Sequence, residues 1–189
     1  EHDTLLLKLP KTAIFSASNS TVANLLVDEE IDGVLATIIA FIYETTIFRK
    51  GSHWYEYLKS IRICDSNGQL ILPPNHWDSV ERNLLKGSTL DTLHGGLVPE
   101  DEVREGFEIA SSIAHKWYEE FGLEIPLEVF GKGSKDKDLQ YLRFVAVAYA
   151  ISSRIFEIDA FHGSALVPLA DLFNHHVLRP DVHFNSLYD

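Results

Sequence analysis

The sequence of 189 residues contains one cysteine, no methionine and fewer basic than acidic side chains. Because Cys64 is alone, an intrachain disulfide framework and a zinc site built from several cysteines are both excluded, which favours a reducing compartment. The absence of methionine and the first residue, Glu1, indicate that the natural start of the protein lies upstream. We therefore expect a fragment of a longer protein.

Basic side chains are scarce, with 16 Lys and Arg against 28 Asp and Glu and a formal net charge of −12. A field of this sign repels a phosphate backbone, so we expect no nucleic-acid partner and regard a basic protein as a better match. Long apolar runs are also missing, because the longest, residues 34–43, is too short to span a bilayer. We expect no membrane partner and a cytoplasmic location, with the nucleus as a second compartment.

Hydrophobic residues make up 46% of the chain, enough for one globular domain with a core of ordinary size. Residues 31–48 are apolar on nearly every helical face, which predicts a buried helix. Residues 101–121 begin with acidic side chains and repeat apolar positions every three or four residues, which predicts a helix capped by Gly122. Residues 139–158 predict a third long helix, apolar on most faces until polar side chains appear near its end.

Extended structure is predicted at the two ends of the chain. The β-branched and leucine run at residues 4–9 stops at Pro10 and predicts an N-terminal strand. Residues 54–61 have the spacing of a short helix, and residues 166–170 predict a second extended segment. The coarse plan is a strand fragment, a long helical middle and an irregular C-terminal segment in which polar side chains concentrate.

One cluster near the C-terminus contains side chains of the types that bind zinc or iron. Its members are Asp171, His175, His176, Asp181 and His183. Adjacent histidines point apart, no His-x-x-x-His pair is present, and Arg179-Pro180 interrupts a regular presentation, so we expect no metal site. A metal-dependent hydrolase is therefore the weaker alternative.

Arg154 is a cation near the end of the third predicted helix. Burying an isolated guanidinium is costly, so an anion or a ligand should pair with it. Glu157 and Asp159 offer a simple ion pair at the helix end, and the residues alone do not decide between that pair and a ligand.

Four stretches resemble a known family. They are Ser153-Arg154-Ile155-Phe156, Leu-Val-Pro-Leu-Ala-Asp-Leu-Phe-Asn-His at 166–175, Gly-Ser-His-Trp-Tyr-Glu-Tyr-Leu at 51–58 and Leu-Leu-Lys-Gly-Ser-Thr-Leu at 84–90. Together they resemble the SET-domain protein-lysine methyltransferases of the Rubisco large-subunit methyltransferase type. The resemblance implies an α+β SET domain, incomplete at both ends, with a large and mostly helical insert.

The resemblance also implies a division of the chain. Residues 1–19 would form an N-terminal strand region, residues 20–145 the helical insert, and residues 146–189 the C-terminal portion with the Asn-His cofactor motif. The catalytic tyrosine of the family would lie beyond Asp189, so no catalytic residue is assigned within this chain. We expect this segment alone to be poorly active.

The activity implied by the resemblance is transfer of a methyl group from S-adenosyl-L-methionine to a lysine of a non-histone protein, such as a ribosomal protein or a translation factor. Arg154, Asn174 and His175 would bind the cofactor. On the substrate side, the implied residues are Arg154, Ile158, Asp171 and Phe184. Asp171 would border the lysine through its backbone carbonyl, and Phe184 stands where close relatives have a tyrosine. The alternative is a non-catalytic peptide-binding module with a SET fold.

Overall fold

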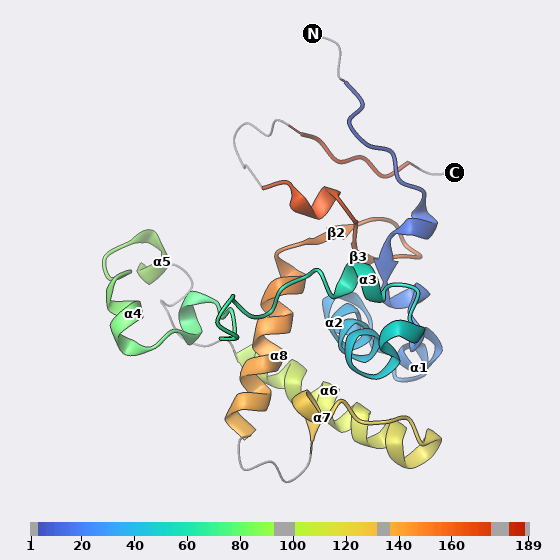
Figure 1. Ribbon diagram of the computed structural model, residues 1–189, viewed down its shortest axis with the longest axis horizontal. Helices are drawn as coiled ribbons and strands as arrows, with labels where there is room; N and C mark the ends of the chain where they lie inside the picture. Colours follow the sequence, from blue (N-terminus) through green and yellow to red (C-terminus); the bar gives the residue numbers. More distant parts are fainter. Residues whose placement is uncertain (1–3, 93–100, 132–136, 175–181, 188–189) are drawn as a thin grey trace.

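The computed structural model describes residues 4–92, 101–131, 137–174 and 182–187, and it shows a helical body with a small antiparallel sheet at one end (Figure 1). The strands and α-helices are, in chain order, β1 (Phe15–Ser16), α1 (Ala23–Asp28), α2 (Gly33–Tyr43), α3 (Tyr55–Leu58), α4 (Ser79–Asn83), α5 (Thr89–Thr92), α6 (Asp101–Phe121), α7 (Leu127–Phe130), α8 (Lys137–Ser152), β2 (Ile155–Glu157) and β3 (Ser164–Leu166). Short helical turns include η1 (Lys11–Ala13), η2 (Ala17–Asn19), the π-turn η3 (Glu44–Phe48), η4 (Arg49–Gly51), η5 (Pro74–His76) and η7 (Ala170–Leu172). This combination is compatible with the predicted α+β class.

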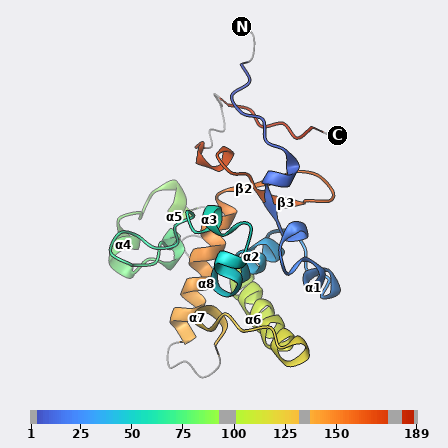
Figure 2. The same ribbon diagram turned by 45° about the vertical axis from the view of Figure 1, so that its right-hand side comes forward.

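Helices α2, α6 and α8 contact one another and enclose the main core (Figure 2). The predicted helix at residues 101–121 is confirmed as α6, with Asp101 and Glu102 in its first turn and Gly122 after its last residue. Gly122 has a φ of +70°, the left-handed conformation that a glycine adopts at lowest cost at a helix end. No helix in the described ranges has the length and apolar composition needed to cross a membrane.

The predicted buried helix at residues 31–48 is confirmed as α2 followed by η3. Every residue of α2 from Ala36 to Tyr43 is buried, because the helix contacts α6 and α8 as well as the sheet. The Thr37 hydroxyl donates a buried hydrogen bond of 2.9 Å to the backbone oxygen of Ser164 in β3. The helical body and the sheet therefore share a continuous interior.

The sheet has the strand order β1-β3-β2, and both pairings are antiparallel. Leu166 in the central strand stands opposite Phe15 on one side and Ile155 on the other. Leu166 is fully buried, as expected for a central strand covered by α2. The N-terminal segment and residues 155–166 are thus joined through β3.

Three predicted boundaries are wrong. Residues 4–9 form no strand, and Leu5, Leu6 and Leu7 are exposed, because the position beside β3 is taken by β1 further along the chain. The third long helix ends at Ser152 rather than continuing to residue 158, and the chain then enters β2. The extended segment predicted at 166–170 overlaps only the last residue of β3, because the chain turns immediately after it.

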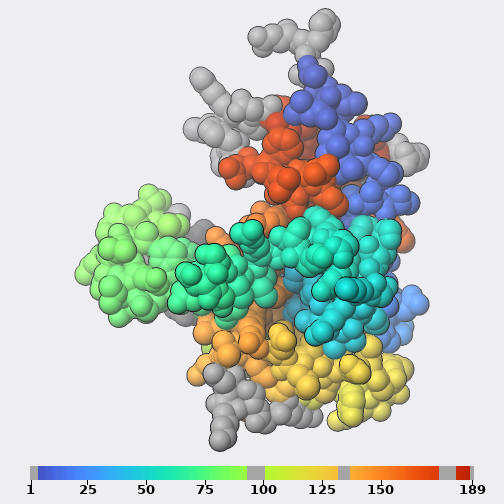
Figure 3. Space-filling view, viewed as in Figure 1, coloured from blue at the N-terminus to red at the C-terminus, as the bar shows by residue number. Residues whose placement is uncertain are grey.

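The segment that contains α4 and α5 projects to one side of the body (Figure 3). Asp78 caps α4 by accepting hydrogen bonds of 2.8 Å from the backbone N–H groups of Val80 and Glu81. Val80 and Leu84 are 71% and 81% exposed, which agrees with a segment that contributes little to the core.

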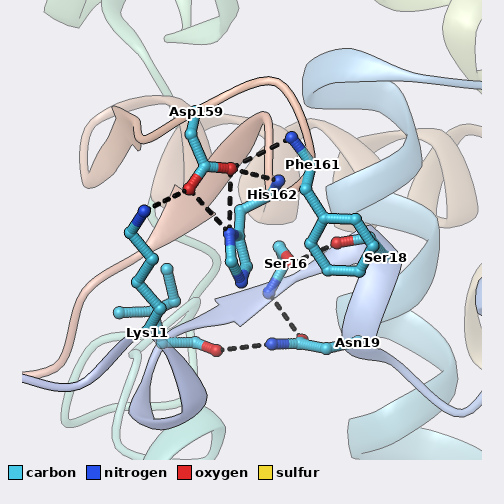
Figure 4. A network of polar contacts seen from close by, with 8 residues as sticks. Lys11, Ser16, Ser18, Asn19, Asp159, Phe161 and His162 are labelled. Atoms are coloured by element: carbon cyan, nitrogen blue, oxygen red, sulfur yellow. Dashed lines mark hydrogen bonds and ion pairs between the residues drawn. The ribbon is translucent and has the colours of Figure 1, made fainter. Parts of the chain in front are cut away.

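A polar network fastens the loop between β2 and β3 to the N-terminal segment (Figure 4). The Asp159 carboxylate accepts hydrogen bonds from the backbone N–H groups of Phe161 and His162 at 3.0 and 2.8 Å, and it forms an ion pair of 2.9 Å with Lys11. The His162 backbone bond, together with Lys11, lowers the pKa of Asp159 well below its ordinary value. The ionised carboxylate therefore holds two separate segments together.

We expect Asp159→Asn to lower the melting temperature at pH 7, because the amide keeps the shape but loses the charge. A carboxyl whose pKa is lower in the folded state stabilises the fold above its unfolded pKa of about 3.9, and this stabilisation is lost as the pH falls further. The difference between Asp159→Asn and wild type should therefore shrink between pH 5 and pH 2 in thermal melts. The exposed Asp28, changed to Asn, is the matched control. A difference that stays constant across this pH range would contradict the role of the charge.

Candidate functional site

Arg154 lies in the turn between α8 and β2 and is half-buried. Its Nη1 donates hydrogen bonds to the backbone oxygen of Ala150 at 3.0 Å and to the hydroxyl of Ser153 at 2.9 Å. Both partners are within four residues, so the last turn of α8 orients the guanidinium. Among the described residues, Nε and Nη2 have no hydrogen-bond partner. The guanidinium therefore keeps donors in the forked geometry that suits a carboxylate.

The simple ion pair with Glu157 or Asp159 is not formed. Glu157 accepts a hydrogen bond from the Ser164 hydroxyl across the β2–β3 pair, and Asp159 is engaged by Lys11 and His162. No carboxylate of the described residues forms an ion pair with Arg154. This leaves a ligand as the anion that the guanidinium requires.

Asp171 lies in η7 and is held by a residue from a distant part of the sequence. The Tyr57 hydroxyl in α3 donates a hydrogen bond of 2.8 Å to Asp171 Oδ2, across a separation of 114 residues. Tyr57 is oriented by its helix, because the neighbouring Leu58 is fully buried in the main core. Figure 1 shows α3 beside the small sheet, on the side where the chain leaves α8.

The electrostatics of Tyr57 connect Arg154 and Asp171. Burial raises the pKa of the Tyr57 hydroxyl above its ordinary value, and the hydrogen bond to Asp171 and its negative charge raise the pKa further. The positive charge of Arg154 opposes this shift, so the guanidinium acts on the same hydroxyl. The phenol is protonated at neutral pH and donates to Asp171. The structure thus joins the predicted residue Asp171 to Tyr57 by a hydrogen bond, and the charge of Arg154 acts on the same hydroxyl.

The other predicted site residues have different environments. Asn174 follows η7 and is exposed, while His175 lies outside the described residues. Ile158 is 8% exposed and packs in a small apolar cluster with Ile14, Ala165 and Val167. Phe184 packs on Phe156 of β2, with 4.8 Å between the ring centroids. Contact of Ile158 or Phe184 with a substrate stays a prediction.

Within residues 4–92, 101–131, 137–174 and 182–187, no group of three or more His, Cys, Asp or Glu side chains is placed to hold a metal ion. Three members of the predicted cluster, His175, His176 and Asp181, lie outside these ranges. Asp171 instead accepts a hydrogen bond from the Tyr57 hydroxyl.

Tyr57 belongs to the site but was not predicted from the sequence. Its spacing from Trp54 and Leu58 predicted only the apolar face of a short helix, which the structure confirms as α3. A buried tyrosine hydroxyl usually has a hydrogen-bond partner, because the phenol is amphipathic. A tyrosine on the apolar face of a predicted helix is therefore the one signal in the sequence that such a partner exists. Nothing local identifies that partner, because Asp171 is brought close by the fold alone.

The chain is 58% identical over 188 residues to "Ribosomal lysine N-methyltransferase 3" of Saccharomyces cerevisiae (strain ATCC 204508 / S288c), and the alignment covers 97% of this chain. The chain spans about a third of that relative, 34% of its length. No protein-family model matches the chain, and no solved structure matches it. The similarity therefore connects this chain to one part of a larger lysine methyltransferase.

Proposed function

We propose that the protein containing this chain is an S-adenosylmethionine-dependent protein-lysine N-methyltransferase that acts on a ribosomal protein. The observation that carries the proposal is the identity of 58% over 188 residues to a ribosomal lysine N-methyltransferase. We further propose that the chain forms part of a SET domain of the Rubisco large-subunit methyltransferase type, in which residues 20–145 are the insert. The small sheet with its long helical excursion is compatible with this arrangement.

The residues around Tyr57 fit a methyl donor that carries a carboxylate. Arg154 has unused guanidinium donors among the described residues, and it would bind the carboxylate of S-adenosylmethionine. Asn174 and His175 would hold the adenosyl part. When bound, S-adenosylmethionine supplies an electrophilic methyl group on its sulfonium. The remaining chemistry depends on how this chain positions the lysine.

A lysine must arrive as a neutral amine to attack a methyl carbon. Burial penalises the ammonium form and lowers the lysine pKa, so an apolar wall beside the amine assists the reaction. The packed rings of Phe156 and Phe184 would supply part of that wall. Asp171 would border the amine through its backbone carbonyl, and Ile158 would lie on the substrate side. The net charge of −12 suits a basic substrate, whose approach it would accelerate.

The proposal is tested with the full-length protein, because this chain spans only a third of the relative. The protein is incubated with S-adenosylmethionine labelled on its methyl group and with ribosomal proteins from cells that lack the enzyme. We expect label on a lysine of a ribosomal protein and none with heat-inactivated protein. Binding of a ribosomal protein without transfer of label would contradict the proposal and favour a non-catalytic peptide-binding module.

We also propose a cytoplasmic or nuclear location, which imaging of the tagged full-length protein would test.

A further inference from the structure

The contact between Tyr57 and Asp171 joins the two parts of the chain that the proposed function distinguishes. Tyr57 belongs to the helical insert, whereas Asp171 and Arg154 belong to the C-terminal portion. The hydrogen bond of 2.8 Å to Oδ2 is the one hydrogen bond that the Asp171 side chain makes with the described residues. Without the Tyr57 hydroxyl, the Asp171 carboxylate would have no hydrogen-bond partner among the described residues.

The backbone that presents Asp171 is strained. Leu169 has a φ of +71° and a ψ of −38°, a conformation that a branched side chain rarely adopts. The following turn is held by few bonds, among them Asp171 N–H to the Val167 oxygen at 3.1 Å and Leu172 N–H to the Leu169 oxygen at 3.3 Å. Strain of this kind persists only where surrounding contacts hold the segment. The Tyr57 hydroxyl supplies such a contact.

The hydrogen bond between Tyr57 and Asp171 also affects the pairing of Arg154. Arg154 and Asp171 carry opposite charges and both act on the Tyr57 hydroxyl, yet they form no ion pair within the described residues. A carboxylate that already accepts a hydrogen bond from a phenol gains less by moving to a guanidinium. A carboxylate released from the phenol would have Arg154 as an available cation. The phenol therefore favours the arrangement in which Arg154 is unpaired.

We propose that Tyr57 is a positioning residue for the methyl-donor site: its hydroxyl holds Asp171 and prevents this carboxylate from occupying Arg154, which stays open to the carboxylate of the donor. This inference rests on the proposed function. Tyr57 touches neither donor nor lysine in this arrangement. It acts through Asp171 on the availability of Arg154.

The test is calorimetric titration of the full-length protein with S-adenosylmethionine. We expect Tyr57→Phe to raise the dissociation constant about tenfold. In this variant the released Asp171 carboxylate would compete with the donor for Arg154, and one charge-assisted hydrogen bond corresponds to about this factor. Tyr55→Phe is the matched control on the same helix, because the Tyr55 hydroxyl makes no hydrogen bond among the described residues. Equal dissociation constants for the two variants would overturn the inference.

A double substitution separates positioning from a merely structural role. If the released carboxylate competes with the donor, then Tyr57→Phe combined with Asp171→Asn should bind the donor as tightly as Asp171→Asn alone, within about twofold. Failure of Asp171→Asn to rescue donor binding would overturn the inference, because loss of structure is not repaired by a second substitution. If wild type neither binds the donor nor transfers methyl groups, the proposed function fails instead. The two failures are therefore distinguishable.

Discussion

Replacing Arg154 by alanine is expected to raise the dissociation constant of S-adenosylmethionine by about 10- to 100-fold. Hydrogen bonds to a charged group contribute about 1.5–3 kcal/mol each, and about 1.4 kcal/mol corresponds to a factor of ten. The guanidinium is already oriented by Ala150 and Ser153, so little ordering accompanies ligand binding. Calorimetric titration of the full-length protein measures the change directly.

The controls for Arg154 test charge and geometry separately. Arg154→Lys should also weaken binding, because an ammonium does not reproduce the planar fork of a guanidinium. Arg143→Ala is the matched control: it removes a guanidinium from α8, the helix that precedes Arg154, where Nη1 donates a hydrogen bond of 3.1 Å to the Glu128 backbone oxygen. Asn174→Ala should weaken binding as well. Unchanged affinity in both Arg154→Ala and Asn174→Ala would remove this site assignment.

The helices of the body were predictable from the sequence because packing leaves a periodic signal. In α6 the buried residues Ala110, Ile113, Ala114 and Trp117 recur at three- or four-residue spacing, which is the spacing of one helical face. Buried Glu44 shows what this signal omits. Its carboxylate is fully buried in the π-turn after α2, where Oε1 accepts a hydrogen bond of 2.6 Å from the Thr21 N–H. A pattern of apolar positions does not reveal such a partner.

The strands were predicted poorly because their length is set by partners rather than by composition. β1 has only two residues, too few for alternation to be visible, and it exists because Phe15 and Ser16 pair with β3. The more strand-like run at residues 4–9 has no such pairing and stays outside the sheet. Propensity alone is a weak guide where pairing decides.

Only part of the site was predictable, because contacts between distant elements leave no local pattern in the sequence. Arg154 was noticeable as a cation beside an apolar run, and the resemblance to a known family drew attention to Asp171. Tyr57 was missed because its contact with Asp171 spans 114 residues and depends on how α3 packs beside the small sheet. Local spacing describes one element at a time. Contacts between elements have no such signature.

We expect Trp117→Ala to reduce the free energy of unfolding by about 3–5 kcal/mol, the usual cost of removing a large buried aromatic side chain. Trp117 is fully buried in α6 and packs against Tyr43 of α2, with 5.3 Å between the ring centroids. Its Nε1 also donates to Glu29 Oε1 at 3.2 Å. Glu29 keeps its ion pair of 2.9 Å with Lys116 after the substitution, so the cavity accounts for most of the loss.

Tyr118→Ala is the control that isolates burial from the loss of an aromatic ring. Tyr118 follows Trp117 on α6 but is 55% exposed, so its removal should cost no more than about 1 kcal/mol. Urea unfolding of the full-length protein, followed by circular dichroism, measures both variants without relying on tryptophan fluorescence. A Trp117→Ala loss as small as that of Tyr118→Ala would mean that α6 does not pack against α2 through this side chain. Because α2 contacts both α6 and β3, the packing of the helical body against the sheet would then have to depend on other side chains.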